Sequence, residues 1–358
     1  MNTVFRHLNS IKPLTFVAVL FFSGLVSAQE PVQNPPAQAE SATQSEPSEA
    51  STSQQAPAVS SSAKLSGGEW LLKMSQAITE LNYVVSMVQS HGGSDTTPYL
   101  WRHGVFDKGV SMEHLSVLNG PGKEYIRVNR VISVFEPDVR PYSLSGSLID
   151  GPFPTELLTD PLSLQTAYDF IAVGRSRVSG RAAQQIRIIS RDNSRYAYQL
   201  WLDEESGMPL KLNMLDLGGK VLEQIQVTQM SLSATPDPYF DRINHDVLPA
   251  VTKIPNRHHQ HNWNIAYLPV GMIEVKRNTH RLADTGQVVE YAMLSDGLVS
   301  VSVYVMPVSA PGLQNNAYRH ESKTVLTRIE GNLQITVIGE VPPQTANQIA
   351  ASLSARVN

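Results

Sequence analysis

Three histidines close together in the sequence are the chain's clearest candidates for metal chemistry. His258, His259 and His261 are interrupted only by Gln260. Neutral imidazoles this close could bind a borderline metal such as zinc or copper. The alternative is that they are solvated side chains at the end of a polar connection, with no ligand. We favour the second interpretation and predict no metal and no cofactor, and any role of these histidines stays open.

Catalytic motifs are missing from the sequence. It contains no G-x-S-x-G elbow, no phosphate-binding G-x-x-x-x-G-K-[ST] loop and no dinucleotide fingerprint. His320 and Glu321 start like a zinc-protease helix, but Thr324 stands where the second ligand histidine must be. With 0 cysteines there is no thiolate nucleophile or disulfide. We therefore predict that the chain is not an enzyme, although scattered Ser, His and Asp side chains could still meet as a triad.

Aromatic and basic side chains between residues 83 and 135 could bind an acylated ligand. An open sheet wrapped around helices can leave an apolar cavity that binds lipid or acyl chains. Arginines among the strands could meet phosphates or carboxylates. The alternatives are a filled core for the aromatic residues and a solvated strand face for each arginine. The candidates are Tyr83, Trp101, Tyr125 and Phe135 for the cavity, with Arg102 and Arg127 for charged head groups.

The elements that would position these side chains follow from the apolar pattern. Apolar residues at helical spacing from Trp70 to Leu81 predict one amphipathic helix that begins near Gly67. After Asn82 the period changes to two, and short β-branched or aromatic segments alternate with turn residues, which predicts strands. These predicted strands cover residues 83–91, 99–106, 113–118 and 124–135.

Two further blocks predict antiparallel sheets. Residues 195–230 read as a meander, because two hairpin turns separate three alternating segments. Tyr196, Tyr198, Leu200 and Leu202 share one face, as do Leu210, Leu212 and Met214. The other face also carries apolar groups, so the sheet is either covered on both sides or lines a cavity. Near the C-terminus, Val299, Val301, Val303 and Val305 share a face, and a hairpin turns at Glu330-Gly331-Asn332. A final helix starts at the prolines and carries Ala346, Ile349, Ala350 and Leu353 on one stripe.

The N-terminus predicts export. Arg6 and Lys12 form a basic region, and the apolar run from Leu14 to Val26 is shorter than the about 20 residues that span a bilayer. A small-x-small site ends at Ala28, and no cysteine follows it for a lipid anchor. An uncleaved anchor is the alternative. A later span is not predicted, and a net charge of −4 without basic tracts disfavours nucleic-acid binding.

The predicted organisation is therefore an α+β, mostly antiparallel chain in several parts. Residues 29–66 are rich in Gln, Ser, Ala, Pro and Glu, and such a segment cannot bury enough apolar surface to fold. The predicted parts are a signal peptide 1–28, a disordered spacer 29–66, a large domain 67–232, a linker 233–257 and a small domain 258–358.

Several separated motifs follow one another in order from about Gly67 to Arg356. They are LNYVVSMVQ, LWRHGVFDKGVSMEHLSVLNGPGKEYIRV, VFEPD, YDFIAVGRSRVSGR, SRYAYQLWLDEESGMPLKLNMLD, YLPVGM, SDGLVSVSVYV and GEVPPQTANQIA. Together these motifs resemble the MucB/RseB family, the periplasmic regulators of the sigma-E envelope stress response. Two departures are the long spacer and the histidine cluster, neither of which is typical of the family.

The resemblance implies both a fold and a function. The large domain should be an unclosed antiparallel β-barrel wrapped around helices, of the LolA/LolB type, and the small domain a compact antiparallel sheet with a helix. Members bind the periplasmic part of a membrane-spanning anti-sigma factor and shield it from site-1 proteolysis. Lipopolysaccharide or mislocalised lipoprotein is thought to release them.

Glu340 and Gln344 flank the Pro342-Pro343 corner of the GEVPPQTA motif and could contact such a partner. A rigid strand-to-helix turn with a capping role is the alternative for these two residues. A periplasmic carrier of lipid or lipoprotein without a regulatory partner is the second functional hypothesis, although a carrier needs only the first domain. The sequence leaves open whether the chain forms a homo-oligomer, which acyl ligand it binds and which surface meets the partner.

Overall fold

The structure is a computed structural model that describes residues 64–92, 96–252, 260–281, 286–308 and 312–355. The predicted signal peptide 1–28, nearly all of the predicted spacer 29–66, and His258 and His259 lie outside the described residues. The order of elements begins with one helix, continues through eleven strands, and ends in a second set of strands with a C-terminal helix.

The first helix, α1 (Gly67–Glu80), begins where the sequence predicts it. The Ser66 hydroxyl accepts a hydrogen bond from the Glu69 amide at 3.3 Å, and the Glu69 carboxylate accepts one from the Ser66 amide at 2.7 Å. This reciprocal capping box satisfies two backbone donors that the first turn would otherwise leave unpaired. The helix buries Trp70, Met74 and Ile78 on one side, as their spacing predicts.

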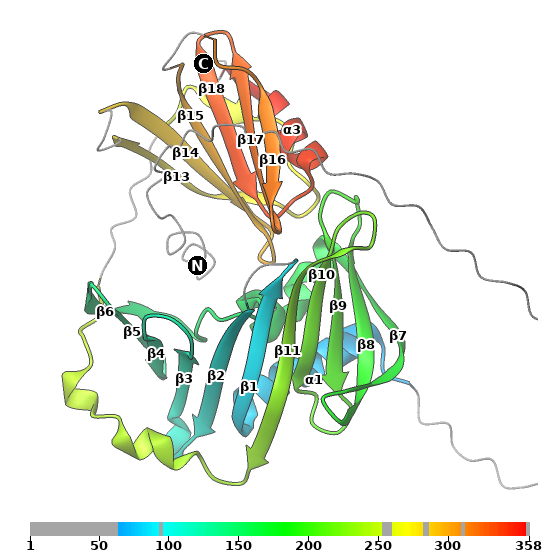
Figure 1. The fold of residues 1–358 in the computed structure, drawn as a ribbon, viewed down its shortest axis with the longest axis vertical. Helices are drawn as coiled ribbons and strands as arrows, with labels where there is room; N and C mark the ends of the chain where they lie inside the picture. Colours follow the sequence, from blue (N-terminus) through cyan, green and yellow to red (C-terminus); the bar gives the residue numbers. More distant parts are fainter. Residues whose placement is uncertain (1–63, 93–95, 253–259, 282–285, 309–311, 356–358) are drawn as a thin grey trace, which may run out of the picture. The chain divides into compact units, whose positions relative to one another are not determined.

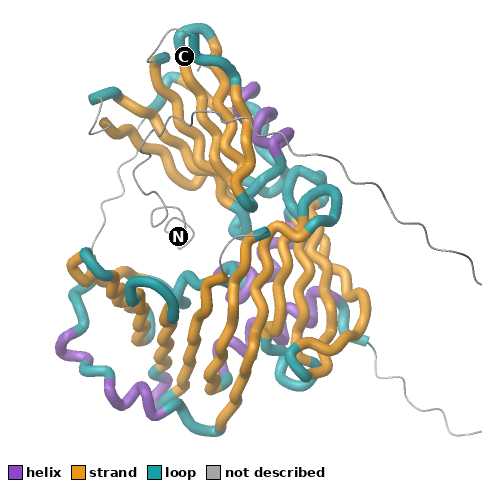
Figure 2. Tube along the Cα trace, viewed as in Figure 1, coloured by secondary structure: helices purple, strands orange, loops and turns teal. Residues whose placement is uncertain are grey.

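An eleven-stranded antiparallel sheet packs one face against α1. The strand order is β6-β5-β4-β3-β2-β1-β11-β10-β9-β8-β7, so the end strands β6 and β7 do not pair with each other and the sheet does not close (Figures 1 and 2). This confirms the predicted unclosed, mostly antiparallel sheet around a helix. The strands are β1 Asn82–His91, β2 Thr96–Val105, β3 Ser111–Val117, β4 Lys123–Val128, β5 Val131–Glu136, β6 Val139–Ser145, β7 Tyr168–Val178, β8 Arg181–Ser190, β9 Ala197–Asp203, β10 Pro209–Leu215 and β11 Val221–Ser233.

Two details differ from the sequence prediction. The segment 124–135 forms two strands, β4 and β5, because the chain turns at Asn129, whose φ of +53° is a conformation that Asn tolerates better than most residues. Leu210 does not join Leu212 and Met214 in the main core. The register shifts between Pro209 and Lys211, and Leu210 packs with Val178 and Ala183 instead. A β-bulge of this kind changes the face to which a side chain points.

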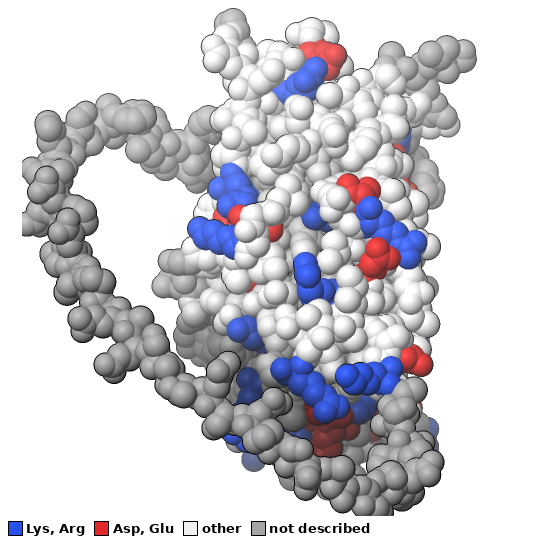
Figure 3. All heavy atoms as spheres, turned by 90° about the vertical axis from the view of Figure 1, so that its right-hand side faces the viewer, with Lys and Arg blue, Asp and Glu red and all other residues white. Residues whose placement is uncertain are grey.

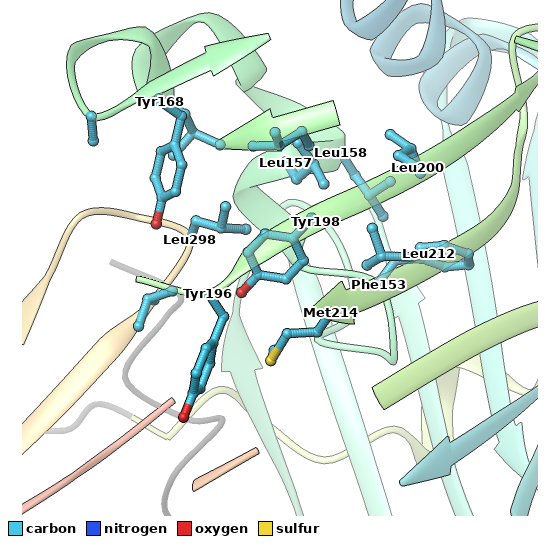
Figure 4. Packing of buried hydrophobic residues seen from close by; sticks show 14 of the residues in the cluster. Phe153, Leu157, Leu158, Tyr168, Tyr196, Tyr198, Leu200, Leu212, Met214 and Leu298 are labelled. Carbon is cyan, nitrogen blue, oxygen red and sulfur yellow. The ribbon is translucent and has the colours of Figure 1, made fainter. Parts of the chain in front are cut away.

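The face of the sheet toward α1, which we call the inner face, carries the main core. Tyr198, Leu200 and Leu202 from β9 and Leu212 and Met214 from β10 are buried there. A short helix, α2 (Thr155–Thr159), adds Leu157 and Leu158, and the preceding segment adds Phe153. Figure 4 labels all of these side chains except Leu202 and shows them close together. The alternation predicted for the meander is confirmed at β9 and at the end of β10.

The segment that follows β11 lies against the outer face of the same sheet. It forms two short 3₁₀ turns, η4 (Pro238–Arg242) and η5 (His245–Val247). Phe240 is buried and contacts Phe106 edge-on, with ring centroids 5.8 Å apart. Further on, the Pro249 carbonyl accepts a hydrogen bond from Ser143 at 2.7 Å. The described part of the predicted linker thus contacts the sheet at Phe240 and at Pro249, while the domain boundaries themselves stay a prediction.

A second antiparallel sheet of six strands follows, with the order β13-β14-β15-β18-β17-β16. Val301, Val303 and Val305 are buried on one face, and β17 and β18 form the predicted hairpin, with Gly331 at φ +61°. The helix α3 (Pro343–Ala351) ends earlier than predicted, and Leu353 lies in a short strand instead. The six strands are β13 Ile273–Arg281, β14 Val288–Ser295, β15 Ser300–Pro307, β16 Asn316–His320, β17 Lys323–Glu330 and β18 Leu333–Gly339. Two short strands, β12 Trp263–Ile265 and β19 Leu353–Ala355, pair with each other in a separate two-stranded sheet. Among the described residues, no helix has the length and apolarity needed to cross a membrane.

Candidate functional site

A buried carboxylate lies at the centre of the inner face. The side chain of Glu113, on β3, has no solvent exposure. One oxygen accepts a hydrogen bond from the Trp101 indole at 2.8 Å. The other accepts from Arg127 Nε at 2.7 Å and from the Ile149 backbone amide at 3.0 Å. Three donors around one ionised carboxylate offset the desolvation of its charge, which burial would otherwise make very unfavourable.

The guanidinium of Arg127 is held in turn by β3 and by its own hairpin. It donates to the Ser111 hydroxyl at 2.9 Å and to the Asn129 carbonyl at 2.7 Å. Arg127 is therefore the buried counter-ion of Glu113, with a side chain that is 4% exposed. The sequence prediction that Arg127 meets a charged head group stays a prediction. In this structure its hydrogen bonds go to the protein.

Two of the four aromatic residues proposed for a cavity lie beside this network. Tyr83 and Trp101 are both buried and pack edge to face, with ring centroids 4.9 Å apart. Burial raises the pKa of the Tyr83 hydroxyl well above its usual value, and the nearby Glu113 carboxylate adds to the shift. Tyr125 is half-buried and packs against the core, and the Lys123 ammonium lies 5.6 Å from its ring centre. Phe135, on β5, is also half-buried.

The inner face holds a small apolar cavity of about 10 Å³ at this place. Such a volume holds about one water molecule, whereas sites for small-molecule ligands have volumes of about 300–1,000 Å³. Trp101 lines this cavity, and Tyr83, Tyr125 and Phe135 do not. At this place the inner face is thus closely packed. The residues that line the cavity are Met87, Trp101, Leu115, Ile149, Gly151, Pro152, Phe153 and Leu158.

Arg102 points to the opposite side of β2 from Trp101, as alternation in a strand requires. Its guanidinium lies 4.4 Å from the ring centre of Tyr239, in the segment after β11, and 3.7 Å from the Asp237 carboxylate. It also lies 3.0 Å from Nδ1 of His114 on β3. Arg102 therefore fixes the connecting segment to the outer face. Its predicted contact with a ligand head group remains a prediction.

The imidazole of His114 completes this outer cluster. It packs against the Tyr239 ring at an interplanar angle of 30°, with ring centroids 4.3 Å apart, and its Nε2 lies 3.1 Å from the Tyr239 hydroxyl. Burial, together with the positive charge of Arg102, lowers the pKa of His114 to about 4 against the opposing effect of Asp237. The ring is therefore neutral at neutral pH, where it can accept a hydrogen bond from Arg102.

A second buried ion pair joins segments far apart in the sequence. Arg195 and Asp296 both have fully buried side chains, with Nε and Oδ2 3.0 Å apart. The Tyr168 hydroxyl donates to the same carboxylate oxygen at 2.9 Å, and Arg195 lies 5.1 Å from the Tyr168 ring centre. Arg195 also donates to the Val270 carbonyl. These contacts tie the start of β7 and the segment before β9 to the turn between β14 and β15.

The two residues proposed to contact a partner lie at the corner before α3 and differ in exposure. Glu340 is half-buried and accepts a hydrogen bond from the Ser322 hydroxyl at 3.4 Å. Gln344 is exposed and lines a groove of about 400 Å³ between α3 and the edge strand β16. Every residue of β16 is exposed. The groove residues are Asn315, Asn316, Ala317, Leu326, Thr327, Arg328, Pro343, Gln344 and Asn347.

Of the three clustered histidines, only His261 lies within the described residues. Its ring is buried and stacks on Trp263 at 4.9 Å, and its Nε2 lies 2.9 Å from the Asn278 carbonyl. Desolvation lowers the pKa of its imidazole. Among the described residues, no group of three or more His, Asp or Glu side chains is arranged to hold a metal ion.

Arginines on or next to β7 and β8 form ion pairs with nearby carboxylates. Arg175 lies 2.8 Å from Glu204, and Arg191 lies 3.0 Å from Asp169. Figure 3 shows one face of the molecule, on which Lys and Arg side chains are interspersed with Asp and Glu on a mostly uncharged surface. Over the described residues of this face, charges of the two signs are mixed.

Sequence reasoning missed Glu113, Arg195 and Asp296. One signal for Glu113 was available, because it alternates with Leu115 and so falls on an apolar face of a predicted strand. A charge at such a position needs a buried partner. Arg195 and Asp296 carry no comparable local signal, since their pairing depends on how two distant segments meet.

Comparison with known families accounts for nearly all of the folded chain. Residues 66–252 match the MucB/RseB N-terminal domain, and residues 257–354 match the MucB/RseB C-terminal domain. The sigma-E factor regulatory protein RseB of Salmonella typhimurium is 33% identical over 298 residues, which cover 82% of this chain and 92% of the relative. The sigma factor AlgU regulatory protein MucB of Pseudomonas aeruginosa is 29% identical over 80% of this chain and 90% of the relative.

A solved structure is similar over the same range. The complex structure of Pseudomonas aeruginosa MucA/MucB contains a chain that matches 82% of this chain and 99% of its own length, with a TM-score of 0.65 and 26% identity. A crystal structure of MucB in complex with MucA(peri) matches with a TM-score of 0.64 and 27% identity, over 82% of this chain and 100% of that one. The similarity therefore includes both sheets.

Proposed function

The chain belongs to the MucB/RseB family, and from this we propose that it is a periplasmic negative regulator of an envelope stress response governed by sigma-E. It would bind the periplasmic part of a membrane-spanning anti-sigma factor and shield that part from site-1 proteolysis. The observation that carries the proposal is the similarity to MucB in complex with MucA(peri), which extends over both sheets of this chain. A simple lipid carrier would need only the first sheet.

Release by an acylated ligand is the second half of the proposal. If lipopolysaccharide or a mislocalised lipoprotein binds the free regulator better than the complex, it weakens the complex by the same factor. A regulator of this kind acts through binding equilibria alone and needs no catalytic group or cofactor. The acyl chains would enter the large domain, near Trp101 and the other aromatic residues named above.

The groove beside Gln344 is the surface that we assign to the partner. Its exposed amide side chains, on Asn316, Gln344 and Asn347, can both donate and accept hydrogen bonds, as an extended peptide requires. The neighbouring edge strand β16 has no strand on its outer side among the described residues. An added peptide strand is a common way to bind such an edge. Glu340, which is half-buried and bonded to Ser322, would support the corner instead.

Export by a cleavable signal peptide, residues 1–28, would place the chain where this partner is. The segment lies outside the described residues, so the proposal depends on its basic, apolar and small-residue regions in the sequence. Fractionation of cells into periplasm, membrane and cytoplasm, with N-terminal sequencing of the mature protein, tests it. A mature N-terminus at Gln29 is expected, and a protein that keeps residue 1 in the membrane fraction would contradict it.

Partner binding can be measured with the chain from Gln29 onward and the periplasmic segment of the anti-sigma factor, by pulldown and calorimetry. We expect a complex that added lipopolysaccharide weakens. Gln344→Arg should weaken it by about tenfold or more, because a long charged side chain would fill the groove. Gln348→Arg is the matched control, since Gln348 is exposed on the same helix and does not line the groove. Acyl binding without partner binding would favour the carrier hypothesis.

A further inference from the structure

The edge strand β7 is accessible along most of its length. Residues 169–177 are all exposed except Phe170, which is half-buried. Two aliphatic side chains among them, Ile171 and Val173, are 45% and 53% exposed. Figure 1 shows β7 at one end of the large sheet, and among the described residues no strand pairs with its other side. Natural proteins cover or charge a long edge of this kind, because it can otherwise pair with another chain.

Arginines accompany these aliphatic side chains. Arg187, on β8, lies opposite Ile171 in the register, so the two side chains share one face of the sheet. Arg175 and Arg177 follow Val173 along β7 and are both exposed. We call Ile171, Val173, Arg175, Arg177 and Arg187 the β7 edge surface.

The positive charge of the β7 edge surface is only partly compensated. Arg175 lies 2.8 Å from Glu204, yet its side chain stays 73% exposed. Arg177 and Arg187 form no ion pair with any carboxylate of the described residues. The other carboxylates nearby already pair with other arginines, in the pairs Arg181–Asp203, Arg181–Glu205 and Arg191–Asp169. An occupant of this surface should therefore carry negative charge.

The chain itself contains a segment with this charge. Residues 29–63, which lie outside the described residues, contain four glutamates and no Asp, Lys, Arg or His, so their side chains carry a net charge of −4. The glutamates are Glu30, Glu40, Glu46 and Glu49. We call residues 29–63 the acidic segment. It has few large apolar residues with which to build a core of its own, so its carboxylates are its main means of binding.

The start of α1 attaches the acidic segment beside β7. A Cβ atom at Gly67 would overlap the Phe170 carbonyl and lie 3.0 Å from the Ile171 amide nitrogen, so the first residue of α1 packs directly on β7. Ser48, between two of the glutamates, is 19 residues before Gly67. A flexible chain of that length has a root-mean-square span of about 24 Å, and the strand from Ile171 to Arg177 covers about 20 Å. The glutamates near Ser48 are therefore within reach of the β7 edge surface, at a local concentration in the millimolar range.

We propose that the acidic segment docks on the β7 edge surface of its own chain and covers it. Its carboxylates meet Arg177 and Arg187, which lack partners elsewhere in the described chain, and the contact is weak, reversible and sensitive to salt. The docked segment keeps this edge from pairing with other chains and screens its arginines from anionic ligands. The inference does not depend on the anti-sigma partner or on the response to acylated ligands.

A second copy of the chain is the less suitable occupant. Its own β7 would bring the same arginines to this edge, whereas the acidic segment brings carboxylates. The register of β7 also shifts between Ala172 and Arg175, and such a bulge interrupts the ladder that an added strand would extend. Charge pairing with a tethered segment needs no continuous ladder.

The test uses the chain from Gln29 onward with Ser48→Cys, which provides a single thiol because the sequence contains 0 cysteines. A nitroxide label on this thiol enhances the NMR relaxation of backbone amides that lie near it, and we expect the strongest enhancement at residues 171–177. Because the segment is tethered beside β7, the informative quantity is the dependence on charge. Replacing all four glutamates with glutamine should reduce the enhancement there at least about threefold, and about 0.5 M NaCl should do the same.

The arginines are tested in the same way. Arg177→Gln together with Arg187→Gln should also reduce the enhancement at residues 171–177. The matched control is Arg130→Gln together with Arg140→Gln, because both arginines are exposed and lie at the other end of the same sheet, next to β5 and on β6. The control should leave the enhancement within about 1.5-fold of its original value. Circular dichroism checks that both arginine variants are folded.

Each outcome decides for or against the cover. An enhancement at residues 171–177 that falls in the glutamine variant, in the Arg177 and Arg187 variant and at high salt, but not in the control, supports it. An equal enhancement with and without these charges would show that only the tether brings the label near β7, and would overturn the docking. A mixture of spin-labelled chain with unlabelled, ¹⁵N-enriched chain identifies the occupant. Enhancement as strong in the mixture as within one chain would assign the cover to a second copy and overturn the intrachain contact.

Discussion

The fully buried pair of Arg195 and Asp296 gives the most quantitative prediction. Asp296→Asn keeps the volume of the side chain and can keep the bonds that Oδ1 accepts from the Leu298 and Val299 amides, at 2.9 and 2.8 Å. It replaces Oδ2, which faces Arg195 at 3.0 Å and the Tyr168 hydroxyl at 2.9 Å, with an amide donor or an uncharged oxygen. Arg195 is then a buried cation without its close counter-ion.

The expected loss can be estimated from the burial of the pair. Breaking a fully buried ion pair by removing one partner destabilises a protein by about 3–5 kcal/mol. Asp192 lies 4.0 Å from Arg195 and should keep the loss near the lower end, at about 3 kcal/mol. Urea unfolding at pH 7.5, followed by tryptophan fluorescence and circular dichroism, measures the free energy of unfolding. Asp160→Asn, at an exposed position, is the control and should change it by less than about 0.5 kcal/mol.

A double-mutant cycle isolates the interaction itself. Arg195→Met alone leaves Asp296 as a buried anion, so it should also be strongly destabilising. In the double variant neither charge remains, and the combined loss should be smaller than the sum of the single losses by about 2 kcal/mol or more. Additive losses, or a loss below about 1 kcal/mol for Asp296→Asn, would refute the reasoning that the two charges are desolvated together.

Three further predictions concern Glu113, His114 and Gly271. Glu113→Gln should lower the free energy of unfolding in urea by about 3 kcal/mol, because Arg127 stays buried without its counter-ion. Arg127→Met should lower the free energy of unfolding less in the Glu113→Gln variant than in the wild type. The folded pKa of His114, about 4, lies below its ordinary value of 6.5. As the pH falls, the unfolded chain therefore binds this proton before the folded chain does, and the free energy of unfolding should drop by up to about 3 kcal/mol between pH 6.5 and 4. His114→Gln should remove that part of the pH dependence. An unchanged dependence of the free energy of unfolding on pH would count against the neutral buried ring. Gly271→Ala should lower the melting temperature markedly more than Gly286→Ala. Both glycines have positive φ, but only the new Cβ at position 271 would meet a neighbour, Ala167, at 2.7 Å. An equal decrease in melting temperature for the two variants would mean that this contact can relax.

The regular elements could be predicted because their causes are local. The stripe from Trp70 to Ile78 and the alternation from Tyr198 to Leu202 each encode a periodicity of one element, and the structure has both. Errors arose where a single residue changes the local geometry. Asn129 turns the chain between β4 and β5, and the register shift at Lys211 separates Leu210 from Leu212.

The candidate site was harder to predict because it depends on contacts between distant segments. Arg102 and Arg127 are recognisable in the sequence as charges on strands, yet their partners, Asp237 and Glu113, become visible only when the segments are brought together. The small cavity on the inner face is a further example. A sheet that curves around a helix can enclose a cavity, and the space left here depends on segments far apart in the sequence, which contribute Met87, Ile149 and Leu158 to its lining.

Protection of the anti-sigma factor from proteolysis tests the central claim most directly. The cleavage rate of its periplasmic segment by the site-1 protease would be measured with increasing amounts of the chain from Gln29 onward, with and without lipopolysaccharide. The account predicts that cleavage slows in proportion to the bound fraction and that lipopolysaccharide restores the rate. Cleavage that continues at full speed when the segment is saturated with the chain would contradict it.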